Sequence, residues 1–599
     1  MKPVDVGTGM VVASFGCREP SLLSLTTTHP THGVVELAGA VPFDESGRGT
    51  PDAVRAYRAA LADDASACCW LEAPDGERCT DATLDATDPA APHWLGHLGT
   101  ARLAAAARAV DPAVLELRWQ LDGWQSPAPP QVRFAGRLAL STLAEITETN
   151  PLPPSTQSSS LRADGGSLTV SSSELSSTAS LALDHGAWQV GAEHAATWAS
   201  SASGKRLTIV LRVTIGATEG WQASRRPAAT PAAPPDDEGL SRLTTRALAY
   251  VRGCTALRTG TDERVILTDH RLLPLSWTRD AYYQALLLLA AGTPADTEAV
   301  ADHLRWLWRR CDRPEGLWAR SHHADGRRKD LAFQADQQVY PVLEACDYWR
   351  LTGSLPDGVD WTDAVAAAWS QIMARTDTHT GLLATVENAA DDPAAAPFVA
   401  SSQILLWYAA RRLTELAAAA ALGLDAAELV ATADRLRNAF RSSFEAQRPW
   451  PYAVDGKEGS ILYHDANDLP LALAPVWGLC APGDDGWRAT MDFAWSSRNP
   501  GWFGGERGGV GSVHTPHPWA LGDVQDWLVG RATGDAGRCA RAVERLNAVA
   551  FVDGMLPEAY SAGRRPDVRI RHWFAWPGAA FGALQLLDAR GEVDLRLRA

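Results

Sequence analysis

Apolar and polar positions alternate with a period of two along the first 220 residues, and clusters of turn residues interrupt the alternation. The clearest runs are SLTVSSSELSSTASLALD and KRLTIVLRVTIG. This period places every second side chain on one face of a strand, and short strands separated by turns are typical of antiparallel sheets. We therefore predict an N-terminal β-sandwich over residues 1–222. The Ala-rich run ARLAAAARAV, residues 101–110, instead suggests a short helix on the sheet.

The alternation ends in a segment, residues 223–239, that has the composition of a linker. In SRRPAATPAAPPDDEG, Pro and Ala replace every large apolar residue, and three acidic residues follow. Such a segment has no side chains with which to build a core. We expect a linker there and a second domain over residues 240–599.

In the second domain, apolar residues recur at intervals of three and four, which predicts amphipathic helices. Eleven or twelve such segments are present, among them TRDAYYQALLLLAAG and SSQILLWYAARRLTELAAAAALG, and long loops rich in Gly, Pro and Asp separate them. A helical solenoid would need a repeating sequence unit, and we find none. The pattern favours an (α/α)6 barrel, so the predicted fold class is mixed: a β-sandwich followed by this barrel.

The charge of the chain limits its partners. The 599 residues carry a formal net charge of −16, whereas nucleic acids and anionic membrane surfaces require a basic face. The chain also holds 24 Trp against 12 Phe. Most of these Trp residues are expected in helix packing, but a flat ring with a polar edge also suits stacking on sugars. An uncharged substrate is therefore expected, with neither nucleic acid nor membrane as partner.

The cysteines and the N-terminus point to a cytoplasmic protein. The nine Cys residues are scattered and odd in number and form no CxxC pair, so we expect reduced thiols. The first twenty residues contain no apolar run of signal-peptide length, and no run elsewhere approaches 18 apolar residues.

Polar and aromatic residues gather in loops at the ends of helical segments, and a barrel would bring these loops to one mouth. The loops span residues 275–284, 332–341, 381–403, 462–470, 499–519 and 554–560. The natural candidate carboxylates are Glu558, in a turn flanked by Gly and Pro, and the pair Asp391 and Asp392. Two carboxylates across a sugar are what glycoside hydrolysis requires, because one protonates the leaving oxygen and the other activates water or attacks the anomeric carbon.

These loops, in order, resemble glycoside hydrolase family 125, the metal-independent exo-acting α-mannosidases. The resemblance rests on SWTRDAYYQ, ADQQVYPVLEACDYWRLTG, ADDPAAAPFVASSQ, HDANDLP, NPGWFGGERGGVGSVHTPHPW and EAYSAGRRPDVRIRHWFAWPGAAFG, and covers about residues 250–599. The Trp-x-Arg-Asp and Leu-Pro-Glu pieces also resemble family 15 glucoamylases, which share the (α/α)6 fold and the inverting mechanism. HDANDLP and GVGSVHTP favour family 125.

The resemblance implies catalytic roles for the loop carboxylates. Glu558 matches the general base, which deprotonates the attacking water. The general acid falls in the Asp–Asp pair; we favour Asp391, with Asp392 on substrate hydroxyls, although the order is open to reversal. Repulsion between like charges would raise one pKa of the pair. The preceding residues, TVENAA, depart from the Arg and aromatic residues usual there, and Glu387 is a reserve acid.

The resemblance also implies a set of sugar-binding residues. Arg279 and Asp280 are similar to a pair that clamps adjacent hydroxyls at the innermost subsite. The further members of the set are Trp277, Asp336, Asp465, Asn467, His514 and Trp573. The candidates for the pocket walls are Trp277, Trp502, Trp519, Trp573 and Trp576, with core packing as the competing explanation for the last two.

No cofactor and no catalytic metal are expected. The pairs in HTPH and SHH do not have the i, i+4 spacing that directs two imidazoles at one ion, and no further ligand motif accompanies them. The predicted function is an inverting exo-glycosidase that releases a terminal α-linked sugar, with mannose in an α-1,6 linkage as the expected sugar. The alternatives are an α-glucosidase of the glucoamylase type, a phosphorylase, which Glu558 argues against, and a sugar-binding protein without catalysis. A homodimer is an open possibility.

Overall fold

The computed structural model of the chain describes most of its residues. They are residues 2–39, 41, 56–57, 59–140, 158–191, 194–217, 241–260, 262–329, 332–420, 422–570 and 573–592. The predicted linker, residues 223–239, lies outside this set. The last N-terminal strand ends at Ala217 and the first helix of the second region begins at Arg242.

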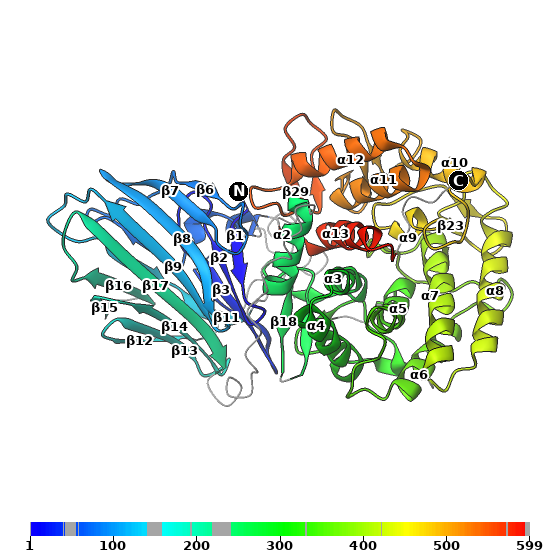
Figure 1. Cartoon of the computed structure of the whole chain (residues 1–599), viewed down its shortest axis with the longest axis horizontal. Coiled ribbons are helices and arrows are strands. Elements are labelled where there is room, and N and C mark those ends of the chain that lie inside the picture. Colours follow the sequence, from blue (N-terminus) through cyan, green and yellow to red (C-terminus); the bar gives the residue numbers. More distant parts are fainter. Residues whose placement is uncertain are drawn as a thin grey trace.

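The N-terminal region is built from two large antiparallel sheets (Figure 1). The first follows the order β1-β2-β3-β5-β10-β16-β15, with β4 pairing with β3 and β11. Its strands are β1 (Val4–Gly7), β2 (Val11–Phe15), β3 (Leu22–His29), β4 (Gly33–Ala38), β5 (Cys69–Glu72), β10 (Gln131–Ala135), β11 (Arg137–Leu140), β15 (Gly186–Val190) and β16 (Ala195–Ser200). The second follows the order β12-β13-β14-β17-β9-β8-β7-β6. Its strands are β6 (Thr83–Asp85), β7 (His93–Leu98), β8 (Ala101–Asp111), β9 (Val114–Asp122), β12 (Ser160–Asp164), β13 (Ser167–Ser172), β14 (Ser177–Leu183) and β17 (Arg206–Ala217).

The two sheets share one hydrophobic cluster, to which alternate residues of their strands contribute. In β14, for example, every second residue from Ser177 to Leu183 is buried, as the period of two predicts. The helix expected at residues 101–110 is wrong, because this segment forms β8. Ala101, Leu103, Ala105 and Ala107 are its buried residues, so alternate burial in the sheet outweighs the helix propensity of Ala.

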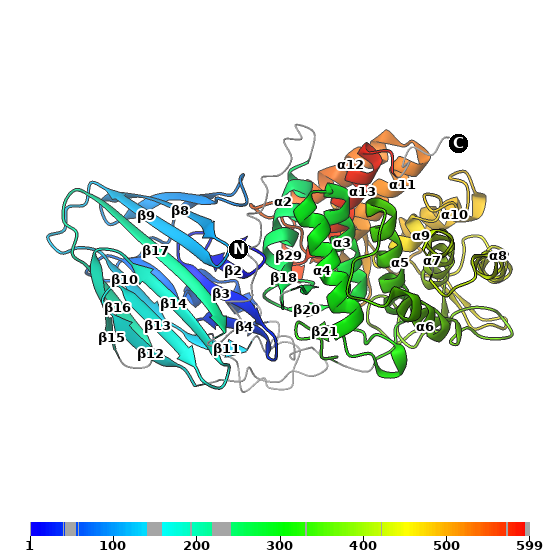
Figure 2. The same cartoon turned by 60° about the horizontal axis from the view of Figure 1, so that its bottom comes forward.

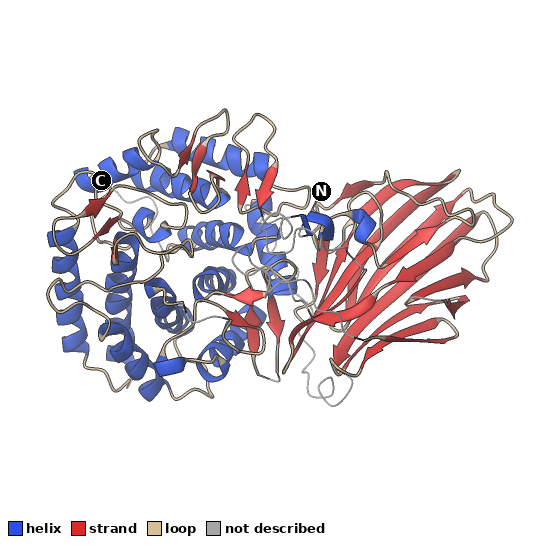
Figure 3. Cartoon of the chain, turned by 180° about the vertical axis from the view of Figure 1, so that it is seen from behind, coloured by secondary structure: helices blue, strands red, loops and turns tan. Residues whose placement is uncertain are grey.

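Six helices of the second region form a closed ring, which confirms the expected (α/α)6 barrel; Figure 3 shows several of them end-on. The inner helices are α3 (Thr278–Ala291), α5 (Ala335–Thr352), α7 (Ala400–Ala419), α9 (Leu469–Ala472), α11 (Ala520–Thr533) and α13 (Ala575–Ala589). Each contacts the next, and α13 returns to α3. Every residue of α3 is buried, as expected for a helix covered on all sides.

An outer layer of helices covers the ring. It consists of α2 (Arg242–Tyr250), α4 (Pro294–Arg305), α6 (Trp361–Met373), α8 (Ala426–Ser443), α10 (Asp485–Ala494) and α12 (Ala536–Val549). Apart from α10, each packs on an inner helix, and α10 is tied to α9 by the Trp487 indole, which donates to the Leu471 carbonyl at 3.0 Å. The periodicity of the sequence did not reveal α10. Another of the segments with helical periodicity, LALAPVWGLC at residues 471–480, is mostly a turn in the structure.

Short strand pairs shape the loops at the mouth of the barrel. They are β18 (Ala256–Arg258) with β19 (Arg264–Ile266), β20 (Leu275–Ser276) with β21 (His322–His323), β22 (Phe398–Val399) with β23 (Ala453–Val454) and β24 (Ser460–Ile461), β25 (Trp502–Phe503) with β26 (Gly509–Ser512) and β27 (His517–Pro518), and β28 (Ala559–Tyr560) with β29 (Val568–Ile570). A π-helical turn, η4 (Val251–Thr255), extends α2.

The first strands of the N-terminal sheet pack directly on the barrel, beside α2 and β18 (Figures 1 and 2). All five residues of β2 are buried, and Val12 and Val34 belong to the same hydrophobic cluster as the barrel core. Gly7 meets Gly253 of η4 so closely that a Cβ atom at residue 7 would lie 2.1 Å from the Gly253 carbonyl oxygen. The two regions therefore share a dry, closely packed interface.

Within the described residues, no helix is long and apolar enough to cross a membrane. All nine cysteines are free of disulfide bonds, and seven of them are buried.

Candidate active site

The N-terminal ends of the inner helices converge on one pocket. Trp277, Trp519 and Phe574 are the residues immediately before α3, α11 and α13, and all three line it. The empty space of the pocket, including the part that is open to solvent, is about 330 Å³. Its remaining lining residues are Arg279, Asp280, Ala389, Ala390, Asp391, Asn467, His514, Glu558 and Trp576. Residues from five of the six loops noted in the sequence therefore line one cavity, and the structure brings the two predicted catalytic carboxylates, Asp391 and Glu558, to it.

Glu558 lies at the end of a tight loop that precedes β28. Gly554 opens the loop with a φ of +84°, a conformation that favours glycine. The Glu558 carbonyl accepts a hydrogen bond from the Ala520 amide at 3.2 Å, which fastens the loop to the first turn of α11. The side chain is only 3% exposed, so its carboxylate faces the pocket from a largely desolvated position.

Asp391 is held by a compact turn and by three N–H donors. The Asn388 side chain accepts from the amides of Ala390 and Asp392, and Asp391 itself has a φ of +64°, an uncommon conformation for a residue with a Cβ. Its carboxylate accepts from Gln334 Nε2 at 2.6 Å, from the Trp277 indole at 3.2 Å and from Arg279 Nη2 at 3.5 Å. Each of these donors favours the ionised carboxylate.

Asp392 turns to a different partner, since its Oδ1 lies 2.9 Å from Nδ1 of His514. This hydrogen bond, set against partial burial, raises the pKa of His514 to about 9, and the charges of Glu558 and Asp391 contribute. The imidazole is therefore a cation at neutral pH. The neighbouring carboxylates of Asp391 and Asp392 therefore contact separate groups.

Arg279 is the central cation of the pocket, with an exposed fraction of 4%. Its Nη1 donates to Asp336 Oδ2 at 2.7 Å, and its guanidinium lies 5.1 Å from the centre of the Trp576 ring. Burial alone would lower the pKa of Arg279, but the carboxylates of Asp336, Asp391 and Asp280 raise it above its ordinary value. The predicted clamp thus contains Arg279 with three carboxylates around it.

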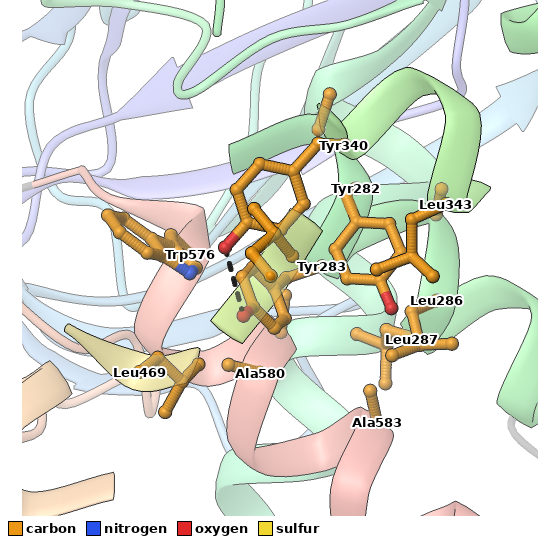
Figure 4. Packing of buried hydrophobic residues seen from close by; sticks show 14 of the residues in the cluster. Tyr282, Tyr283, Leu286, Leu287, Tyr340, Leu343, Leu469, Trp576, Ala580 and Ala583 are labelled. Atoms are coloured by element: carbon orange, nitrogen blue, oxygen red, sulfur yellow. Dashed lines mark hydrogen bonds between the residues drawn. The ribbon is translucent and has the colours of Figure 1, made fainter. Parts of the chain in front are cut away.

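The ring of Trp576 rests on a packed aromatic layer. It stacks on Tyr283, whose hydroxyl lies 3.3 Å from that of Tyr340 (Figure 4). Tyr282 and Leu286 extend this layer toward the barrel core (Figure 4). The floor beneath Arg279 is therefore closely packed. Trp576 both packs in the barrel core and lines the pocket, so the two explanations given for it from the sequence both apply.

Two predicted sugar-binding residues lie behind the pocket lining and hold residues that line it. Asp336 binds Arg279, as described above. Asp465 is 2% exposed, and its oxygens accept from Tyr463, from Ser512 and, at 2.7 Å, from the Asn467 side chain. These contacts suit a role for Asp465 in positioning Asn467 better than a direct contact with a substrate hydroxyl.

Trp573 does not line the pocket, contrary to the prediction. It is fully buried at the interface with the N-terminal sheet, where its indole donates to Asp5 Oδ2 at 2.9 Å. Trp502 is half-buried in β25 and is likewise absent from the lining, whereas Trp519 and Trp277 are part of it. The reserve acid Glu387 pairs with Arg320 at 3.0 Å.

Gln334, Asn388 and Phe574 were missed in the sequence. Gln334 precedes α5 and bridges the carboxylates of Asp391 and Glu387 through its side-chain nitrogen, at 2.6 and 3.3 Å. The sequence could have indicated Gln334 as a site residue, because it lies in the AFQADQQ loop directly before a predicted helix. Among the described residues, no group of three or more His, Cys, Asp or Glu side chains is arranged to hold a metal ion.

Comparison with known families and structures confirms the resemblance. Residues 365–586 match the family described as metal-independent alpha-mannosidase (GH125). This match includes Asp391, His514 and Glu558 but not Arg279. A search among curated proteins found no match.

Among solved structures, a bacterial glucoamylase complexed with acarbose is similar over all of this chain and 95% of its own, with 10% identity and a TM-score of 0.63. This likeness covers both regions and shows the fold. A metal-independent α-mannosidase of Streptococcus pneumoniae, in a non-productive complex with α-1,6-mannobiose, is 20% identical over 58% of this chain and 93% of its own, with a TM-score of 0.48. A family GH78 rhamnosidase of Bacillus sp. GL1 has 14% identity and a TM-score of 0.43, and the similarity covers 81% of this chain and 47% of the rhamnosidase.

Proposed function

Since the GH125 match over residues 365–586 identifies this chain as a glycoside hydrolase, we propose that it removes a terminal α-linked mannose by single displacement with inversion. The observation that carries the proposal is the presence of Asp391 and Glu558 in one small pocket, within the matched segment, beside the Arg279 clamp. The family implies the sugar, and the pocket supplies the two carboxylates that the reaction requires.

Glu558 is proposed as the general base. Its loop places the carboxylate in a site walled by Trp277, Trp519 and Phe574, where a water molecule between it and the anomeric carbon would be shielded from bulk solvent. An inverting site keeps its two carboxyl groups about 6.5–9.5 Å apart to admit that water. The oxygen of water attacks as Glu558 takes its proton, and the bond to the leaving oxygen breaks as the acid protonates it.

Asp391 is proposed as that acid, because it lines the pocket. The N–H donors of Gln334, Trp277 and Arg279 hold its carboxylate in place, and the step requires a proton on this carboxylate. Asp392 remains the second candidate through its contact with His514. An acid variant keeps activity on substrates with good leaving groups such as 2,4-dinitrophenol, because these depart without protonation, and a variant of a merely binding residue does not.

Exo action is proposed because aromatic residues close the floor and walls of the pocket. A pocket closed in this way suits one terminal sugar unit. A second candidate function, hydrolysis of α-glucosides, is favoured by the glucoamylase-like fold over the whole chain.

The test is release of p-nitrophenol from aryl α-mannosides and α-glucosides, with and without EDTA, with the anomer followed by NMR. We expect α-mannoside hydrolysis with inversion, insensitive to EDTA, and a loss of at least a hundredfold in Glu558→Gln. Preference for α-glucosides would select the second candidate. Full activity of Glu558→Gln, or inert α-glycosides throughout, would contradict both.

We also propose that the two N-terminal sheets form a β-sandwich domain over residues 1–222, that residues 223–239 link it to a catalytic domain over residues 240–599, and that the protein acts in the cytoplasm as a homodimer. The shared cluster between the sheets supports the sandwich, and the nine free cysteines support a reducing compartment. Limited proteolysis between residues 223 and 239 tests the linker, cell fractionation tests the location, and sedimentation velocity tests the dimer.

A further inference from the structure

A buried cluster of charges joins the first strand of the N-terminal sheet to the barrel. Lys2 Nζ lies 2.7 Å from Asp5 Oδ2 and 2.7 Å from Asp553 Oδ2. Arg246 of α2 completes the cluster, with its Nη2 3.0 Å from Asp553 and 3.7 Å from Asp5. All four side chains are at most 2% exposed, so two cations and two carboxylates neutralise one another away from water.

The cluster is held in its charged form. Burial alone would lower the pKa of Lys2, but Asp5 and Asp553 raise it; burial would raise the pKa values of these carboxyls, but their cationic partners lower them. Removing one charge from such a cluster leaves another buried without compensation, which is far more costly than losing an exposed ion pair. The geometry of the cluster is therefore strongly specified.

One arm of the cluster leads to the loop of the proposed base. The Asp553 Oδ1 atom accepts from the Met555 amide at 3.1 Å, and the Phe551 amide donates to the Met555 carbonyl at 2.9 Å. Glu558 follows three residues after Met555. Lys2 therefore fixes, through Asp553, the turn from which Glu558 enters the pocket.

A second arm leads to the aromatic wall. Asp5 Oδ2 accepts from the Trp573 indole at 2.9 Å, and the next residue, Phe574, lines the pocket. The Ala575 amide donates to the Thr268 carbonyl at 3.2 Å, so the start of α13 is also tied to the loop before α3.

A third arm reaches the clamp. Asp5 Oδ1 accepts from Ser14 at 2.7 Å and lies 3.5 Å from His270 Nε2. Two residues before His270, the Thr268 hydroxyl donates to Asp280 Oδ2 at 2.7 Å, and Asp280 lines the pocket. A separate buried ion pair, Glu36 of β4 with Arg271, fastens the same loop to the N-terminal sheet.

From this geometry we infer that Lys2 and Asp5, both in the N-terminal sheet region, are positioning residues of the glycosidase site. Asp5 sits where the three arms meet, and each arm ends at a pocket segment, namely those of Glu558, Phe574 and Asp280. The inference rests on the proposed function for the role of Glu558. It gives the N-terminal sheets a part in catalysis, since the barrel alone contains neither anchor.

The test compares three variants of the full-length chain by kinetics and by hydrogen exchange. Lys2→Met releases the base loop, so we expect kcat to fall about tenfold or more with little change in KM, and the acidic limb of the kcat/KM pH profile to shift. Trp573→Phe removes only the donor to Asp5 and keeps an aromatic ring, so we expect a rise in KM with a smaller change in kcat. Asp5→Asn is expected to change both. Amide exchange of residues 551–560 should accelerate in Lys2→Met and Asp5→Asn.

The matched control is Glu19→Gln, which weakens a bidentate pair between two residues of the N-terminal sheet region, Glu19 and Arg78, at 2.8 and 2.6 Å. It should leave kcat, KM and the exchange of residues 551–560 unchanged. The inference is overturned if Lys2→Met and Trp573→Phe keep kcat and KM within twofold, or if Glu19→Gln changes them equally. The exchange measurement needs no substrate, so it supports or overturns the anchoring even if no α-glycoside is hydrolysed and the proposed function fails.

Discussion

Replacement of Arg279 by Lys tests the clamp most directly, because it keeps the charge and removes the fork of donors. The guanidinium donates to Asp336 at 2.7 Å and reaches Asp391 at 3.5 Å from a second nitrogen. A single ammonium can keep the first contact but not both, since Lys presents one point charge on a flexible stem. The variant should therefore fold with its buried charge balance intact and lose the link between Asp336 and Asp391.

The size of the effect follows from the lost contact. A hydrogen bond to a charged group is worth about 1.5–3 kcal/mol. If it is fully used in the transition state, kcat/KM for an aryl α-mannoside should fall roughly 10- to 150-fold. Arg279→Met, by contrast, would leave three carboxylates around an uncharged side chain and should destabilise the fold by about 3–5 kcal/mol.

Arg252→Lys is the matched control. Arg252 makes a comparable bidentate pair with Asp296, at 2.8 and 2.6 Å, and does not line the pocket. The kcat/KM of Arg252→Lys should stay within twofold of wild type. Its loss of thermal stability should be similar to that of Arg279→Lys. The reasoning is refuted if Arg279→Lys retains more than half of the wild-type kcat/KM, or if Arg252→Lys loses as much.

Three further predictions concern protonation. The folded-state pKa of His514 is raised to about 9, so its ion pair with Asp392 is complete below about pH 6.5 and is lost as pH rises through 9; KM should rise over that interval in wild type and stay flat in His514→Gln. Burial, followed by the charge of Asp465, raises the pKa of Asp468 from 3.8 to about 8. The folded state therefore keeps a proton that the unfolded state releases, so the free energy of unfolding falls as pH rises from about 4 to 8, and thermal melts of Asp468→Asn should vary less over this range. Burial raises the pKa of Glu344 well above its ordinary range, and its carboxyl receives no hydrogen bond from the described part of the chain; Glu344→Gln should therefore melt no lower than wild type at pH 7, and a clear drop would show that the carboxyl is ionised.

The positions of the pocket loops could be predicted from the sequence because each motif lies in a segment that leads into an inner helix or begins one. Asp391, Glu558, Arg279 and His514 all reach the pocket for this reason. The sequence does not reveal which residues of a motif face away from the pocket. In HWFAW, Trp573 and Phe574 are neighbours, yet one contacts the N-terminal sheet and the other lines the pocket.

Long-range partners account for most of the remaining errors. Nothing near VDVG indicates that its single acid, Asp5, meets Trp573 568 residues later. Asp465 was expected on the substrate because it belongs to a motif, but Tyr463, Ser512 and Asn467 occupy its oxygens. The Ala-rich strand β8 is a similar case, since the sheet on which it packs decides its structure.

The location of the pocket explains how several carboxylates can be buried around it. The inner helices point their N-terminal ends toward the pocket, and five of these helices are at least 14 residues long. Each such end carries a partial positive charge, which stabilises anions within the first turn. Asp280, Asp336 and Asp523 lie in the first turns of α3, α5 and α11, where this effect offsets part of the cost of their burial. Arg279 and the His514 imidazolium supply the remaining compensation, so the site can present carboxylates to a neutral sugar without a metal ion to balance them.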